Sequence, residues 1–236
     1  MKRVIELVES VRRCHPTDRF FANFLESCKE NPFKYRQYKI YDRALMTLDE
    51  DSWSTLRQKA IAHYLDHRKG QLKQGFFNQL NEAFAYQFLV RSGFTNVHFL
   101  PEKANTKTPD ICFVDNANKR YCEVKTLSIS DALIQRRAES RVSDGSIYKE
   151  LDDGFLHKLD SSINQALKQL GSNSCDGIVF LLVNFDDIAL DYYKTYRRQL
   201  SAFLHNHTAK EVYIKVGIHG RRRLYKKASA LSRSRA

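Results

Sequence analysis

The sequence predicts an α/β fold in which a mixed central sheet is preceded by an N-terminal helical lobe. Residues 1 to 72 carry apolar side chains at helical spacing, as in Val4, Val8 and Val11. From Phe76 the pattern changes to helix, three strands, helix, strand, helix and strand. With 236 residues, 42% of them hydrophobic, the chain is long enough to bury a substantial core.

The helical lobe is expected to span residues 1–72. Pro16 and Pro32 interrupt it, and its last helix is predicted to begin at Asp51 or Ser52 and to end at Lys69 and Gly70. No residues in this region have the spacing of a catalytic or metal site. We therefore expect packing to be its main role, and its aromatic helices are the one hint of a protein partner.

The core is expected to span residues 73–220. A helix from Phe76 to about Gly93 is followed by a short strand at 96–100 and by a hairpin. The hairpin strands are 110–114 and 120–125, and a two-residue turn at Asn116-Ala117 pairs Val114 with Lys119.

The second half of the core is predicted to contain two helix and strand pairs. The helices are 155–171 and 190–204, and the strands are 178–185 and 212–218. The nearly unbroken apolar run in 178–185 indicates a strand covered on both faces, and the preceding helix suits parallel pairing. Residues 221–236 read as a basic tail.

Charge favours a polyanionic partner. Lys and Arg total 39 against 27 Asp and Glu, a net charge of +12, and the pI is near 9.5. Such a balance suits nucleic acid, and it also fits a ribosome-associated or acidic-membrane protein. No segment approaches the ~20 apolar residues that span a bilayer, and the five cysteines form no CxxC pair. We expect no membrane partner and a reducing, cytoplasmic location.

Three side chains of the predicted hairpin can carry phosphodiester chemistry. The two-residue turn puts Asp110 directly opposite Glu123, with facing Cβ atoms ~4.5 to 5.5 Å apart. Two carboxylates that close repel each other unless a cation lies between them. Mg²⁺ prefers oxygen ligands, so the carbonyl of Val124 is a further candidate ligand. Lys125 lies two positions beyond Glu123 and projects from the same face, where it can assist an attacking water.

These residues carry a resemblance to a known family. Pro109-Asp110 followed by Glu123-Val124-Lys125 resembles the PD-(D/E)xK motif of the restriction-endonuclease-like nucleases, and the element order from 76 to 218 resembles their αβββαβ core. The resemblance implies Asp110 and Glu123 as metal ligands and Lys125 as the residue that assists the water. It also implies a Mg²⁺-dependent endonuclease, with Mn²⁺ as an alternative metal, acting on DNA.

The resemblance extends to the helix before the first strand, where members often add an acidic residue. Glu82 matches that place and shares a helix stripe with Asn78 and Tyr86, although a solvated glutamate is nearly as good a reading. Lys158 and Gln165 occupy the helix after the motif, and for these a solvated role is favoured.

Basic residues outside the core motif are candidates for gripping phosphates. They are Arg136, Arg137 and Arg141 in the polar stretch, and Arg221, Arg222, Arg223, Lys226 and Lys227 near the C-terminus. A charged surface turn and an uninvolved tail are the corresponding alternatives.

Other readings of the whole chain stay open. The hairpin charges can form an ordinary solvated face. The chain can also be a noncatalytic nucleic-acid-binding protein, or a structural subunit that pairs through its helical lobe. Cutting both strands of DNA would suit a homodimer with two sites. No Gly-rich phosphate loop or Gly-x-Ser-x-Gly elbow is present, which argues against an NTPase and an α/β-hydrolase.

Overall fold

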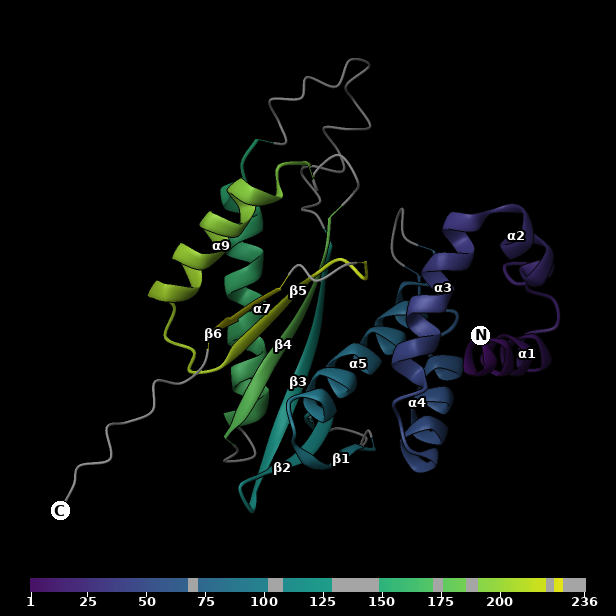
Figure 1. The fold of residues 1–236 in the computed structure, drawn as a ribbon, viewed down its shortest axis with the longest axis horizontal. Coiled ribbons are helices and arrows are strands. Elements are labelled where there is room, and N and C mark those ends of the chain that lie inside the picture. Colours follow the sequence, from purple (N-terminus) through teal and green to yellow (C-terminus); the bar gives the residue numbers. More distant parts are fainter. Residues whose placement is uncertain are drawn as a thin grey trace. The chain divides into compact units, whose positions relative to one another are not determined.

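Helices precede a six-stranded mixed sheet in the computed structural model of the protein (Figure 1). It describes residues 1–67, 72–101, 108–128, 149–171, 176–185, 191–219 and 223–226. The chain forms two compact units, Met1–Cys122 and Glu123–Ala236. The division falls inside a strand, whereas the sequence places its first boundary after residue 72. The helix after that residue packs against the two before it, so it belongs to the first unit.

The first unit contains five helices among its described residues. They are α1 (Lys2–Cys14), α2 (Phe24–Glu30), α3 (Pro32–Leu45), α4 (Glu50–Ala62) and α5 (Gln74–Arg91). An aromatic cluster lies in their core, where Phe21 stacks on Tyr64 at 5.9 Å between ring centroids and Tyr64 meets Phe76 edge-on at 5.6 Å. Four of these helices lie within residues 1–72, the range predicted as a helical lobe, and α5 packs against two of them.

The predicted end of α4 at Lys69 and Gly70 is wrong. The helix ends at Ala62, and residues 63–67 continue as a turn and a loop. The apolar spacing predicted a longer helix because Tyr64 is buried, at 1% exposure, although it lies in the turn. Its hydroxyl donates a hydrogen bond of 2.6 Å to Asp18, which holds the ring in the core without helical backbone.

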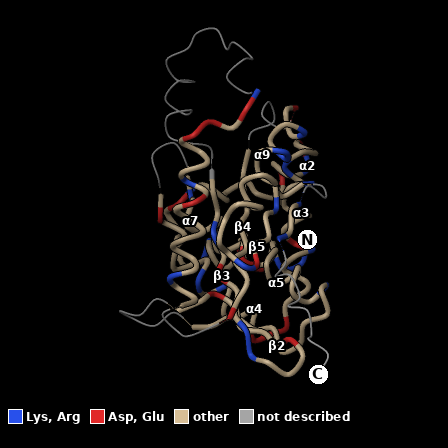
Figure 2. Tube along the Cα trace, turned by 90° about the vertical axis from the view of Figure 1, so that its left-hand side faces the viewer, with Lys and Arg blue, Asp and Glu red and all other residues tan. Residues whose placement is uncertain are grey.

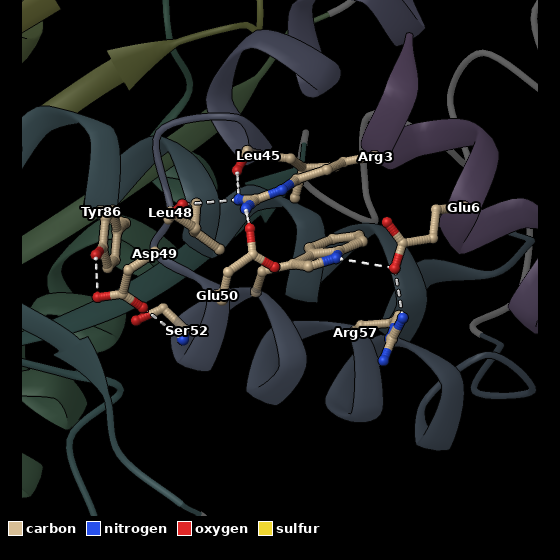
Figure 3. A network of polar contacts seen from close by, with 10 residues as sticks. Arg3, Glu6, Leu45, Leu48, Asp49, Glu50, Ser52, Arg57 and Tyr86 are labelled. Atoms are coloured by element: carbon tan, nitrogen blue, oxygen red, sulfur yellow. Dashed lines mark hydrogen bonds and ion pairs between the residues drawn. The ribbon is translucent and has the colours of Figure 1, made fainter.

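A polar network ties α1 to the ends of α3 and α4 (Figure 3). The guanidinium of Arg3 donates to the carbonyl oxygens of Leu45 at 2.6 Å and Leu48 at 2.8 Å, and it lies 2.7 Å from the Glu50 carboxylate. Carbonyl groups at the end of a helix have no partner within the helix. The buried arginine therefore stabilises the C-terminal end of α3.

The same network reaches α5 through the residue that begins α4. Asp49 caps α4 by accepting the backbone N–H of Ser52 at 2.7 Å, and its other oxygen accepts the hydroxyl of Tyr86 on α5 at 3.2 Å (Figure 3). Tyr86 in turn stacks on Phe99 of β1 (Thr95–Phe99). These contacts fix the position of the first strand against the helices of the first unit.

The hairpin follows the predicted register. β2 (Ile111–Asp115) pairs antiparallel with β3 (Asn118–Ser128), and the partners include Val114 with Lys119 and Ile111 with Cys122. The turn residues Asn116 and Ala117 have φ angles of 47° and 68°. Positive φ at both central residues is the signature of a two-residue hairpin whose twist matches that of its strands.

The second unit contains the end of β3, α7 (Asp153–Gly171), β4 (Gly177–Asn184), α9 (Tyr193–Asn206), β5 (Val212–Val216) and β6 (Arg223–Lys226). Strand order is β1-β2-β3-β4-β5-β6. β4 and β5 are parallel, as expected for strands joined by a helix, and β6 is antiparallel to β5. In Figure 1, α7 and α9 lie on the same side of β4 and β5.

The apolar patterns of this unit are confirmed, with one addition. The buried stripe of α7 is the predicted one, and the interior of β4 is fully buried. Residues 223–226, expected within a basic tail, form β6 instead. Leu224 and Tyr225 pair with the apolar residues of β5, so a short strand forms despite the flanking charges. Among the described residues, no helix is both long and apolar enough to cross a membrane.

The turn geometry predicts the effect of one substitution. Ala117→Gly should raise the free energy of unfolding by about 0.5 to 1 kcal/mol, because an L-residue with a Cβ has a steric penalty at positive φ that glycine avoids. The measurement is urea unfolding followed by circular dichroism.

The control is the same substitution inside a helix of the same unit. Ala83→Gly in α5 should lower the free energy of unfolding by about 1 kcal/mol or more. Destabilisation by Ala117→Gly would contradict the positive φ at the turn.

Candidate active site

Glu123 and Lys125 project from the same face of β3, because residues two positions apart on a strand share a face. The Lys125 ammonium donates a hydrogen bond of 2.7 Å to Oε1 of Glu123. The Glu123 side chain is 1% exposed and that of Lys125 is 28% exposed. A buried carboxylate therefore lies beside a cation that still reaches solvent, and both belong to the second unit.

Gln169 is a site residue that sequence reasoning did not identify. It lies in the last turn of α7, and its Oε1 accepts a hydrogen bond from the Lys125 ammonium at 3.2 Å. Lys125 is thus held between a carboxylate of β3 and an amide of α7. The available signal was helical spacing, because Gln169 is one turn beyond the candidate Gln165, which is exposed.

Asp110 lies at the end of the hairpin in the first unit. It directly precedes β2 and follows the buried Pro109, and its carbonyl oxygen accepts the backbone N–H of Leu100 at 2.9 Å. Its backbone therefore continues the pairing between β1 and β2. The side chain is half-buried, and its carboxylate is a hard oxygen donor of the kind that Mg²⁺ prefers.

Val124 separates the two charged residues of β3. Alternation along the strand turns its side chain to the opposite face, and it is half-buried. Its predicted contribution is a backbone carbonyl. Among the described residues no group of three or more His, Cys, Asp and Glu side chains gathers as a metal site. The predicted ligands include only two carboxylates, so such a group is not required.

Glu82 is buried against α4. Both of its carboxylate oxygens accept hydrogen bonds from the Lys59 ammonium, at 2.8 and 3.1 Å, and both side chains are less than a tenth exposed. This contact gives Glu82 a structural role within the first unit that the sequence pattern did not indicate. Its assignment to catalysis stays a prediction.

The predicted nucleic-acid contacts are only partly within the described residues. Arg136, Arg137, Arg141, Arg221, Arg222 and Lys227 lie outside them. Arg223 and Lys226 lie in β6, and Arg223 pairs in register with Lys215 of β5. Burial, together with the nearby charge of Arg223, lowers the pKa of Lys215 to about 8. Arg223 and Lys226 are therefore the predicted nucleic-acid contacts that the structure describes.

Comparisons with protein-family models, with curated proteins and with solved structures found no match to this chain.

The buried pair of Lys59 and Glu82 allows a test of the role of Glu82. Lys59→Met and Glu82→Gln should each lower the free energy of unfolding by about 3 to 5 kcal/mol, because each removes one partner and strands a buried charge. The double variant Lys59→Met/Glu82→Met should recover much of that loss. Denaturant unfolding without divalent ions is the measurement.

Glu26→Gln on α2 is the control, since Glu26 is exposed and its replacement should change stability little. If Glu82→Gln were as mild as the control, the ion pair would not be a structural element of the first unit.

Proposed function

We propose that this protein is a Mg²⁺-dependent endonuclease that cuts DNA, built on a restriction-endonuclease-like core. The observation that carries the proposal is the 2.7 Å contact between the Lys125 ammonium and the buried Glu123 carboxylate on one face of β3. A water-assisting cation and a metal-binding carboxylate need this proximity, and an ordinary solvated strand face does not require burial of the glutamate.

The element order supports the same proposal. The described elements from α5 to β4 run helix, three strands, helix and strand, the order of the αβββαβ core. The resemblance expects the motif residues next to the second strand and on the third strand of that core. Asp110 precedes the second strand, and Glu123 and Lys125 lie on the third.

The hairpin register supports the place of Asp110. Pairing runs without a slip from the turn to Ile111 and Cys122. Asp110 directly precedes β2 and Glu123 follows Cys122 on β3, so extending the same register by one residue would place them opposite each other. Opposed residues of an antiparallel pair project from the same face of a sheet.

The donor set fits a hard cation. Asp110 and Glu123 would hold Mg²⁺ or Mn²⁺ through carboxylate oxygens, and Val124 would add its carbonyl oxygen. The bound ion would neutralise charge on the phosphoryl oxygens and lower the pKa of a coordinated water.

Lys125 has the role of orienting the attacking water and stabilising the negative charge that develops on the phosphoryl oxygens. Its side chain is 28% exposed, so a phosphate can approach from solvent. Gln169 acts through Lys125. By accepting one of its N–H groups at 3.2 Å, the amide restricts the lysine to the side of β3 that faces α7.

Cleavage of plasmid DNA tests the proposal. The wild-type protein should convert supercoiled plasmid to nicked or linear product with Mg²⁺, and EDTA should abolish the reaction. Asp110→Ala and Lys125→Ala should lower the rate by about a hundredfold or more, the usual effect of removing one group that stabilises the transition state.

Lys168→Ala is the matched control, because Lys168 is an exposed lysine next to Gln169. It should cut at the wild-type rate. Equal rates in wild type, Asp110→Ala and Lys125→Ala would refute the assignment. DNA binding that is salt-sensitive and indifferent to EDTA, with no cleavage by any divalent ion, would identify a noncatalytic binding protein instead.

A further inference from the structure

The second unit contains a groove of about 970 Å³ beside α9 and β6. Basic side chains from three segments line it: Arg197 and His205 of α9, Lys210 of the following loop, and Arg223 and Lys226 of β6. Lys and Arg positions along α9 are blue in Figure 2. Two acidic residues, Asp176 and Glu211, also line the groove. The fixed charges are therefore four positive and two negative, and the groove is cationic.

Glu211 presents little of its side chain to solvent. It is buried at 9% exposure, and its carboxylate accepts the hydroxyl of Tyr225 at 3.1 Å. Arg197, Lys210 and Arg223 are exposed. Lys226 donates to the carbonyl oxygen of His207 at the end of α9, which fixes β6 against that helix. The cations thus border a groove whose two walls, α9 and β6, are joined by this hydrogen bond.

The groove lies at the same end of the second unit as Gln169. α7 ends at Gly171, just before β4 begins at Gly177, and α9 ends just before β5. Because β4 and β5 are parallel, both helices end where these strands begin. Gln169, which contacts Lys125, is in the last turn of α7, and Lys210 lies just before β5.

The spacing of the strands suits a polymeric substrate. β4 and β5 separate β3 from β6 in the sheet, so the two outer strands of this set lie about 14 Å apart. Phosphates on one DNA strand rise about 3.4 Å per nucleotide along the helix axis, so a separation of about 14 Å along that axis corresponds to about four nucleotides.

We infer that the groove between α9 and β6 binds the phosphate backbone of duplex DNA several nucleotides from the bond that is cut. This inference rests on the proposed nuclease function for the position of the scissile phosphate. Besides the basic residues of β6, the phosphate-binding residues of the groove are Arg197 and Lys210, and His205 is a hydrogen-bond donor. They position the duplex and read no sequence, because phosphate contacts carry no base information.

Binding of a labelled duplex oligonucleotide, measured by fluorescence anisotropy in EDTA over a series of salt concentrations, tests the groove without requiring cleavage. The double variant Arg197→Ala/Lys210→Ala should bind more weakly. The slope of log affinity against log salt should fall by about 0.9 for each phosphate that the variant no longer neutralises, and so by about 2.

The matched control is Lys194→Ala/Arg198→Ala. It removes the same two charges from exposed positions of α9 that do not line the groove. It should retain a slope close to that of the wild type. Circular dichroism should show both double variants folded, since all four side chains are exposed.

The outcomes separate the two proposals. A selective loss of slope in the groove variant, with no cleavage by the wild type, supports the groove as a phosphate-backbone site and refutes the nuclease together with the stated distance from a cut bond. Cleavage by the wild type, with equal slopes in the two double variants, overturns the groove and leaves the nuclease standing. A wild type that neither binds nor cuts duplex DNA overturns both proposals. That result is also the one expected if the groove binds a protein segment and not DNA.

Discussion

The pairing register between β2 and β3 is the constraint on which the candidate site depends. Side chains alternate along a strand, so a slip of one residue would move Glu123 and Lys125 to the other face. The two-residue turn prevents such a slip because Asn116 and Ala117 both adopt positive φ. The chain accepts the steric cost of an alanine in this conformation, and the fixed register is the compensating gain.

Much of this arrangement could be predicted from the sequence because it depends on residues that are close together in the chain. Asn116 tolerates a left-handed backbone, the apolar residues of α7 recur at regular helical spacing, and the apolar run of β4 is typical of a strand that is buried on both faces. The end of α4 could not be predicted in the same way. Tyr64 keeps the spacing of a helix, yet a hydrogen bond to Asp18, distant in sequence, holds it in a turn.

The residues of the candidate site also divide into those that a local pattern predicts and those that depend on packing between distant segments. The strand period predicts that Glu123 and Lys125 share a face, and the structure confirms it. Gln169 depends on how α7 packs beside β3, which no local pattern encodes. β6 was missed for a related reason: its apolar residues are few, and only the pairing with β5 distinguishes this strand from a basic tail.

Two short contacts between a lysine and a buried glutamate occur in the part of the chain that the structure describes, and they differ in solvent access. Lys59 meets Glu82 at 2.8 Å with both side chains less than a tenth exposed, so a substrate has no approach to that ammonium. Lys125 meets Glu123 at 2.7 Å with more than a quarter of the lysine exposed. A buried pair contributes specificity of packing at a high cost in desolvation. A phosphate can approach a pair whose lysine is exposed to solvent, and for that reason the chemistry that we propose involves Lys125 and not Lys59.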